Sequence, residues 1–344
     1  MKKYILYNST LKGDNNAGSK AGRDAVTIAE NCGYHFVELY KSKGTHTTIR
    51  NVADGLWNTW KLCCKLKEGD IVFLQYPVNR ALMNQMYKML NCKKVHLITL
   101  IHDIDFLRDV PLGEQGVDGM KRLELSLLSQ SEYLICHNDS MIDVLKQCGL
   151  KNKLISLDLF DYLYEGLGAE IRTNGSVIVA GNLTEQKAGY LYKLKDQKFS
   201  LALYGSGLKD GFENRNAVYY GSFSPDELIP NLRGSYGLVW DGSECDTCAG
   251  SYGKYLRINN PHKASLYLAA GLPVIVWKES ALYPFVKDNK VGFGVVSLDQ
   301  IDEEIERHDW SQFRESISII QGLIRTGSFL TETLKKIEKE IMYV

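Results

Sequence analysis

Short apolar runs alternate with amphipathic stretches along most of this 344-residue chain, and this alternation constrains the fold more than any other feature. In the first half, near-continuous apolar runs predict strands at residues 4–7, 35–39, 71–75, 95–101, 133–136 and 154–157. The stretches between them predict helices at residues 18–31, 48–67, 80–90, 118–129 and 140–147. Apolar strands separated by helices are typical of a parallel sheet that is covered on both faces.

The alternation stops at residues 158–175, where Asn174-Gly175 is a strong turn signal, and then begins again. The second half predicts strands at 177–180, 200–204, 217–220, 237–240 and 273–277, and helices at 185–195, 225–232, 262–270, 281–286 and 331–342. A chain of this length usually divides into domains. We therefore predict an α/β fold with two doubly wound, Rossmann-like domains, residues 1–158 and 175–330. Residues 331–344 form a C-terminal helix, for which packing back on the first domain is one option.

Composition excludes several classes of protein. Lys+Arg and Asp+Glu are both 41, so no net field draws the chain to nucleic acid. No apolar stretch is long enough to span a bilayer, and the N-terminus turns polar too soon for a signal peptide. Cys245 and Cys248 form one CxxC without a second pair, which favours a loop sequence over a zinc or redox site. We expect a reduced, cytoplasmic protein, with a peripheral membrane location left open.

The loop at residues 13–26, GDNNAGSKAGRDAV, lies between the first strand and the first helix. Gly13 and Gly18 have P-loop spacing, but Ser19-Lys20 reverses the order of Lys and Ser that a P-loop needs. This disfavours a nucleoside triphosphatase. Small residues before a helix N-terminus still let backbone N–H groups approach a phosphate, so we interpret the loop as a phosphate contact. A plain strand-to-helix turn is the alternative.

His102-Asp103 follow directly on an apolar strand, where α/β sheets present catalytic groups. Asp103-x-Asp105 also matches the DxD motif of metal-dependent sugar transferases, whose carboxylates hold a divalent cation. The alternative is a polar strand end in which Arg108 pairs with Asp105 or Asp109.

The segment GLVWDGSECDTCAGSYGKYLRINNPHKASLYLAAGLPVIVW is the most informative one. A strand ending in Asp241-Gly242 leads into a long Gly-rich loop, as an active-site lid would. Residues 259–263, NNPHK, then head a helix. The positive end of a helix and the Lys263 ammonium can together offset the charge of a diphosphate without a metal. Gly181-Asn182 form a similar strand-to-helix turn, with Lys187 shortly after it. The alternative is an ordinary helix start with a solvated lysine.

The segments HDIDFLR, AGNL, GLVWDG and NNPHKASLYLAAGLPVI resemble GT-B glycosyltransferases, and more narrowly the glucosyltransferase 3-like family and bacterial β-1,6-galactofuranosyltransferases. The resemblance extends over essentially the whole chain. It implies two Rossmann-like domains facing an interdomain cleft, a UDP-sugar donor, and neither a metal nor a cofactor. It also implies a homo-oligomer and an acceptor that is a glycan, a glycoprotein or a lipid-linked saccharide.

The resemblance and the loops above assign roles to particular residues. His102 and Asp103 face the acceptor, with Asp103 as the candidate base and His102 as its rival, and Lys263 offsets charge on the leaving UDP. The donor-binding residues are Asn16, Ala17, Gly18, Gly181, Asn182, Lys187, Tyr219, Tyr220, Asp241, Asn260, Pro261, His262, Lys263 and Ala264. One departure is that the paired glutamates of many retaining GT-B enzymes are absent from residues 262–266, HKASL.

These observations predict a metal-independent enzyme that transfers a hexose, glucose or galactofuranose, from a UDP-sugar. Two alternatives stay open. One is a non-catalytic GT-B-like subunit of a transferase complex, and the other is a metal-dependent transferase built around the DxD motif. The second series of predicted strands and helices, which begins after residue 175, argues against a single-domain transferase of that kind.

Overall fold

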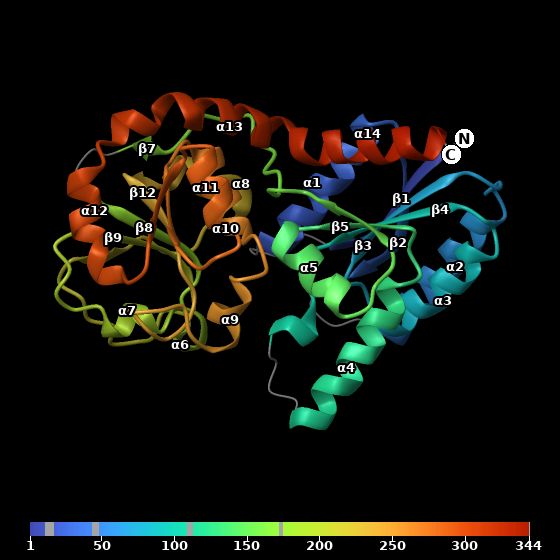
Figure 1. Cartoon of the computed structure of the whole chain (residues 1–344), viewed down its shortest axis with the longest axis horizontal. Helices are drawn as coiled ribbons and strands as arrows, with labels where there is room; N and C mark the ends of the chain where they lie inside the picture. The colour runs from blue at the N-terminus through green and yellow to red at the C-terminus, as the bar shows by residue number, and fades with distance from the viewer. Residues whose placement is uncertain (11–16, 43–47, 109–112, 172–174, 344) are drawn as a thin grey trace. The chain divides into compact units, whose positions relative to one another are not determined.

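The computed structural model describes residues 1–10, 17–42, 48–108, 113–171 and 175–343 (Figure 1). The chain forms two compact units. Unit 1 takes its described residues from 1–14, 18–157 and 329–344, and unit 2 takes them from 15–17 and 158–328. In the described part of the chain, no helix has the length and apolar character needed to cross a membrane.

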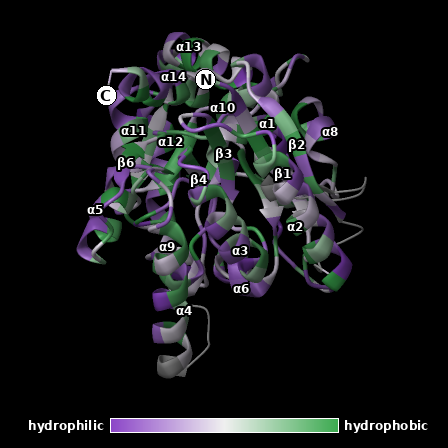
Figure 2. Ribbon diagram, turned by 90° about the vertical axis from the view of Figure 1, so that its right-hand side faces the viewer, coloured by the Kyte–Doolittle hydropathy of each residue, from purple (hydrophilic) through white to green (hydrophobic). Residues whose placement is uncertain are grey.

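Unit 1 contains a six-stranded parallel sheet in the order β2-β1-β3-β4-β5-β6. Its strands are β1 (Lys3–Thr10), β2 (His35–Ser42), β3 (Ile71–Tyr76), β4 (His96–Ile101), β5 (Tyr133–Cys136) and β6 (Lys153–Ser156). Its helices are α1 (Ala17–Asn31), α2 (Ile49–Cys63), α3 (Arg80–Asn91), η1 (Asp105–Arg108), α4 (Gly113–Leu128) and α5 (Asp139–Gln147). Every residue of β3 and β5 is buried, as expected for strands covered on both faces. Along α4, hydrophilic and hydrophobic residues alternate (Figure 2).

The helix α14 (Ser328–Met342) completes unit 1 from far along the chain. Its side chains Leu334 and Ile337 are fully buried. Glu338 accepts hydrogen bonds from the Lys3 ammonium, with a shortest N···O distance of 2.9 Å. The first strand of the chain is therefore tied to one of its last helices.

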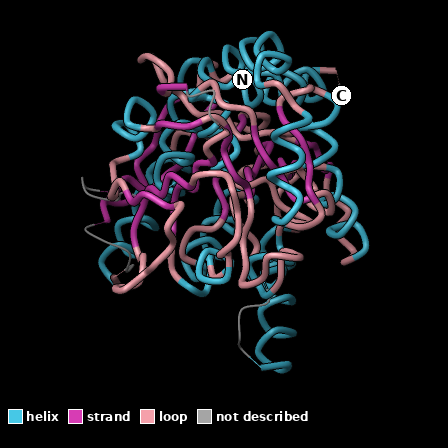
Figure 3. Tube along the Cα trace, turned by 90° about the vertical axis from the view of Figure 1, so that its left-hand side faces the viewer, coloured by secondary structure: helices cyan, strands magenta, loops and turns pink. Residues whose placement is uncertain are grey.

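Unit 2 contains a second six-stranded parallel sheet in the order β10-β9-β8-β12-β13-β14. Figure 3 shows these strands with helices around them. The strands are β8 (Val177–Asn182), β9 (Leu201–Ser206), β10 (Ala217–Tyr219), β12 (Tyr236–Val239), β13 (Val274–Trp277) and β14 (Gly292–Val295), and β7 (Glu170–Ile171) pairs separately with β11 (Arg233–Gly234). The helices are α6 (Glu185–Ala188), α7 (Tyr190–Lys193), α8 (Pro225–Asn231), α9 (Gly250–Tyr255), α10 (His262–Ala270), α11 (Tyr283–Asp288), η2 (Leu298–Gln300), α12 (Ile301–Arg307), η3 (Trp310–Phe313) and α13 (Arg314–Thr326).

Some elements differ from the sequence-based expectation. The strand β14, GFGV, was not expected because its two glycines break the apolar pattern. Gly292 is needed there because a Cβ would lie 1.9 Å from the Val274 carbonyl oxygen of β13. The helices α12 and α13 were also not expected. The irregular segment after residue 157 belongs to unit 2, since Tyr162 N–H donates to the Ile324 carbonyl at 3.2 Å and Ala169 N–H to that of Ala270 at 2.9 Å.

The strand order fixes where each unit offers a ligand site. In unit 1, β2 lies on one side of β1 and β3 to β6 lie on the other. In unit 2, β9 and β10 lie on one side of β8, and β12 to β14 lie on the other. The order therefore reverses between β1 and β3, and between β8 and β12. Ligands of open parallel sheets bind beyond the carboxyl ends of the strands at such a reversal.

Candidate functional site

Two ammonium groups meet one buried carboxylate at the strand reversal of unit 2. Asp241 follows β12 and is 5 % exposed. Its Oδ1 accepts a hydrogen bond from Lys263 Nζ at 2.7 Å, and its Oδ2 lies 3.7 Å from Lys187 Nζ. Lys187 Nζ also lies 5.1 Å from the centre of the Tyr252 ring. The three charged groups together carry one net positive charge, which suits an anionic ligand.

Backbone contacts hold these three side chains in place. Gly242 N–H donates to the Lys187 carbonyl at 2.8 Å, so the end of β12 is bound directly to α6. Gly242 has φ +117°, and a Cβ there would lie 2.3 Å from the Ala249 carbonyl oxygen. Only glycine fits this turn. Lys263 lies in the first turn of α10, where the helix N-terminus adds positive potential beside its ammonium.

The carboxyl end of β8 forms the other side of this reversal. Gly181 and Asn182 are exposed there, and Asn182 Oδ1 accepts a hydrogen bond from Thr184 N–H at 2.9 Å. Gly205 of β9 lies directly beside them, because a Cβ on it would be 1.7 Å from the Gly181 carbonyl oxygen. Gly181 and Asn182 therefore present exposed backbone at the carboxyl end of β8.

The start of α10 is largely buried, and its neighbours hold it in place. Asn260 is 2 % exposed, and its Nδ2 donates to the Asp158 carbonyl at 2.5 Å. The His262 ring lies 5.3 Å from that of Tyr162, between centroids. Pro261 is the N-cap residue and Ala264 is fully buried. Lys263 therefore extends from a well-anchored helix start.

The two tyrosines after β9 are placed differently. Tyr219 is 48 % exposed, and its hydroxyl donates to the Gly205 carbonyl at 2.7 Å. Tyr220 stacks on Tyr204, with ring centroids 5.0 Å apart and an interplanar angle of 8°. Both lie at the carboxyl edge of the sheet of unit 2.

In unit 1, His102 lies at the carboxyl end of β4. Gln75 Nε2 donates to the Gly22 carbonyl at 3.1 Å, so the Gln75 Oε1 faces His102 Nε2 at 2.6 Å as an acceptor. In this contact the proton is on His102 Nε2, and Gln75 fixes the orientation of the ring. Burial lowers the pKa of His102 to about 4, so the ring is neutral at pH 7. A neutral, oriented imidazole can act as a general base.

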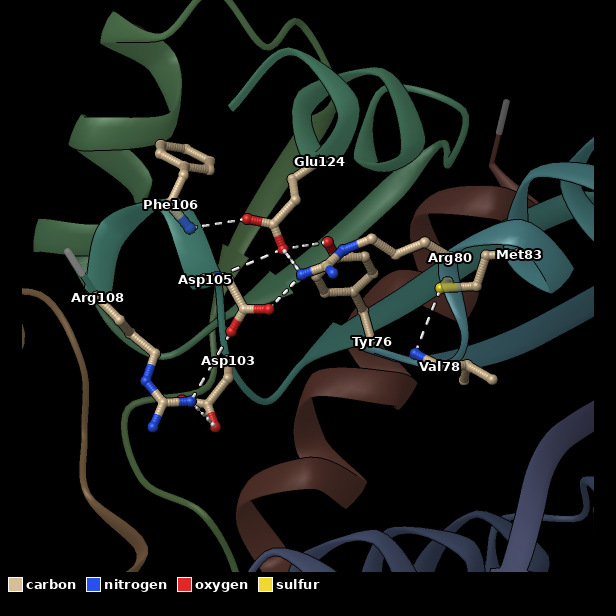
Figure 4. Close-up of polar contacts among 9 residues, drawn as sticks. All are labelled: Tyr76, Val78, Arg80, Met83, Asp103, Asp105, Phe106, Arg108 and Glu124. Carbon is tan, nitrogen blue, oxygen red and sulfur yellow. Dashed lines mark hydrogen bonds and ion pairs between the residues drawn. The ribbon is translucent and has the colours of Figure 1, made fainter. Parts of the chain in front are cut away.

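Both acids of the DxD motif form ion pairs (Figure 4). Asp103 lies 3.3 Å from Arg108, and Asp105 lies 4.0 Å from the same guanidinium. Asp105 also accepts a short hydrogen bond from Arg80. The predicted pairing of Arg108 with Asp105 is thus present, and Arg80 is an additional partner.

Beneath this loop lies the fully buried carboxylate of Glu124 on α4 (Figure 4). It accepts hydrogen bonds from Phe106 N–H at 2.9 Å, Asp105 N–H at 3.3 Å and the Tyr76 hydroxyl at 2.5 Å. Arg80 approaches it to 3.5 Å. Glu124 thus binds the N–H groups at the start of η1, which begins two residues after Asp103.

Sequence reasoning missed Arg80, Glu124 and Tyr76. Glu124 is 44 positions from Arg80 and 48 from Tyr76, and the three residues belong to no motif. A glutamate within the apolar face of a predicted helix was the one available signal.

Among the described residues, no group of three or more His, Cys, Asp or Glu side chains could hold a metal ion. Cys245 Sγ donates to the Tyr190 carbonyl at 3.6 Å, and Cys248 is buried. Burial raises the pKa of both thiols, which disfavours a reactive thiolate. Of the first-loop residues, Asn16 lies outside the described residues, whereas Ala17 and Gly18 begin α1.

Known proteins resemble the whole chain. Residues 2–159 match the family model of the glucosyltransferase 3-like N-terminal domain, and residues 177–337 match that of the C-terminal domain. The beta-1,6-galactofuranosyltransferase WbbI of Escherichia coli (strain K12) is 31% identical over 333 residues, covering 93% of this chain and 94% of that protein. The chain belongs to the glucosyltransferase 3-like family. Glucosyltransferase 3 of Streptococcus gordonii, another relative, is 24% identical over 336 residues, or 94% of each chain.

Solved structures agree on the fold of this family member. Sucrose-phosphate synthase from Thermosynechococcus elongatus aligns over 100% of both chains with a TM-score of 0.63 and 10% identity. An alpha-glucosyltransferase aligns over 100% of both chains with a TM-score of 0.58 and 13% identity. The predictions of a GT-B fold and of an enzyme that transfers a hexose are confirmed. The non-catalytic alternative is therefore disfavoured.

Proposed function

We propose that this family member transfers glucose or galactofuranose from a UDP-sugar to a hydroxyl group of a glycan acceptor, without a metal ion. The observation that carries the proposal is the pair of ammonium groups, Lys187 and Lys263, on Asp241 at the strand reversal of unit 2. A diphosphate would bind both ammoniums and the N–H groups at the start of α10. The relatives named above, a galactofuranosyltransferase and a glucosyltransferase, support the choice of hexose.

In the proposed reaction, the acceptor oxygen bonds to the anomeric carbon of the donor while the bond from that carbon to the phosphate oxygen breaks. UDP leaves with the bonding electrons and gains negative charge. Lys187 and Lys263 stabilise that charge more strongly in the transition state than in the ground state, which accelerates the step.

The acceptor proton needs a base, and unit 1 offers two. His102 is neutral at pH 7, and its ring is oriented by Gln75. Asp103 is 42% exposed but lies 3.3 Å from the positive charge of Arg108. Burial that lowers the pKa of His102 to about 4 also weakens its ring as a base, so we keep Asp103 as the candidate base and His102 as its rival.

Replacing Lys263 with Ala tests the donor site. We expect UDP affinity to fall by roughly tenfold to a hundredfold, because one charge-assisted hydrogen bond is lost. Lys287→Ala is the control, since this exposed lysine lies in the last turn of α11 and should leave affinity unchanged. Isothermal titration calorimetry measures both. Equal UDP binding by wild type and Lys263→Ala would remove the basis of the proposal.

Metal independence has its own test. Because Asp105 is ion-paired with Arg80 and Arg108, we expect EDTA to leave transfer unchanged. Asp105→Asn serves as the matched variant. Loss of transfer in EDTA, restored by Mn²⁺ in wild type but not in Asp105→Asn, would assign the DxD motif to a metal.

We also propose a cytoplasmic homo-oligomer, with an acceptor glycan carried by a protein or a lipid. Light scattering of the purified chain tests the oligomer. Transfer assays with the sugar as a free glycan, on a glycopeptide and on a lipid carrier separate the acceptors.

A further inference from the structure

The helix α2 of unit 1 has an apolar stripe on its solvent side. Spacings of three and four residues place its members on one face of the helix, and these are Ile49, Ala53, Trp57, Trp60 and Cys64. Ile49 is 92% exposed, Trp57 56% and Trp60 50%. The side that packs on the unit is a different set, with Asn51, Gly55, Thr59, Leu62 and Cys63 buried. This stripe is therefore additional to the core face.

The two tryptophans form one aromatic surface. Their rings stack with centroids 4.9 Å apart and an interplanar angle of 18°. By contrast, Trp240 and Trp277 are fully buried. Paired indoles left open to solvent are costly unless another surface covers them, and contiguous apolar patches of this kind mark interaction sites.

Basic residues line one edge of the stripe. Arg50, Lys61 and Lys65 are exposed there, and Lys61 Nζ lies 5.4 Å from the centre of the Trp57 ring. Asp54 is the acid on this edge, and it lies 3.8 Å from Arg50. The edge therefore has a positive charge even though the whole chain has none.

We infer that this α2 face docks on an anionic membrane surface. Trp57 and Trp60 would enter the headgroup region, where amphipathic rings are stable, and Lys61 and Lys65 would contact lipid phosphates. Docking by a second copy of the chain is less favoured, because a symmetric contact would bring the cations of both copies together. The inference goes beyond the proposed reaction and does not depend on the identity of the donor.

Vesicle flotation with the full chain tests this docking. One set of vesicles contains equal parts of phosphatidylcholine and phosphatidylglycerol, and the other contains phosphatidylcholine alone. We expect wild type to float with the anionic vesicles, and the double change Trp57→Ser with Trp60→Ser to lower partitioning at least tenfold. Ile319→Ser with Leu323→Ser removes two apolar side chains, 59% and 40% exposed, from α13 of unit 2, and should have no effect.

The basic edge predicts a second pattern. Lys61→Gln and Lys65→Gln should each lower partitioning on anionic vesicles by about fivefold, and high salt should remove this difference. Brominated lipids should quench tryptophan fluorescence in wild type. A Trp57→Phe, Trp60→Phe variant should still float but lose most of the quenching.

Two results would overturn the inference. One is no flotation of wild type on either vesicle. The other is a dimer in sedimentation that does not bind vesicles and that the Trp57→Ser, Trp60→Ser change converts to monomer. That result would assign the face to a second copy of the chain. Thermal unfolding checks that each variant is folded. UDP calorimetry on the same proteins tests the proposed donor site separately, so failure of one proposal is distinguishable from failure of the other.

Discussion

Replacing the buried Glu124 with Gln should destabilise unit 1 strongly. The side chain is fully buried, and it accepts hydrogen bonds from Phe106 N–H at 2.9 Å and from the Tyr76 hydroxyl at 2.5 Å. Gln keeps one oxygen, so its NH₂ group must face one of these donors. The change also leaves Arg80 with one fewer negative neighbour.

The magnitude follows from the bonds that weaken. Hydrogen bonds to a charged acceptor are worth about 1.5–3 kcal/mol each, so two of them predict a loss of about 3–5 kcal/mol in unfolding free energy. For a unit of this size, about 2–4 °C per kcal/mol gives a melting temperature lower by about 10 °C. Tyr76→Phe, which removes one donor, should lower it by only a few degrees.

Differential scanning calorimetry is the assay, because two units can unfold in separate transitions. Only the transition of unit 1 should shift. Glu68→Gln is the matched control, since this side chain is 73% exposed and pairs with Lys94 at 3.5 Å, a contact worth about 0.5 kcal/mol. If Glu124→Gln melts no lower than Glu68→Gln, the buried carboxylate does not hold the loop as argued.

Two further predictions concern pH and a close backbone contact. His102 has a pKa of about 4 in the folded chain, below its ordinary value near 6.5. The unfolded chain therefore binds the proton first, and stability should fall as pH drops from about 6.5 toward 4. Urea unfolding of His102→Gln across this range should show a shallower fall, and an identical slope would contradict the assignment. Gly205→Ala should prevent normal pairing of β9 with β8, because its Cβ would lie 1.7 Å from the Gly181 carbonyl oxygen. Gly211→Ala, at φ +77° in open space, should cost only about 1 kcal/mol, so thermal unfolding that ranks the two alanine variants equally would refute the steric argument.

The sheets were predictable because their strands are short apolar runs. Each run of unit 1 that predicted a strand is a strand, and polar residues directly after such runs, including His102 and Asp241, lie at the carboxyl ends. The strand β14 was not predictable in this way. Position 292 needs glycine because the backbone of β13 leaves no room for a Cβ, and a hydrophobic pattern does not show this. Helix periodicity likewise gave α14 but missed α13.

The contacts between side chains were less predictable. Lys187 and Lys263 are 76 positions apart, and sequence spacing does not show that Asp241 lies between their ammonium groups. Arg80 and Glu124 follow different strands, and both reach the loop after β4. Such networks depend on the strand order, which hydrophobic periodicity does not specify.

The return of α14 to unit 1 affects synthesis of the protein. A ribosome makes residues 1–157 first. The surface of unit 1 that packs against Leu334 and Ile337 of α14 meets that helix only after residues 158–328 have been made. Until then, the side chains of unit 1 that pack against α14 are without this partner. Residues 158–328, the main part of unit 2, can fold before α14 returns to unit 1.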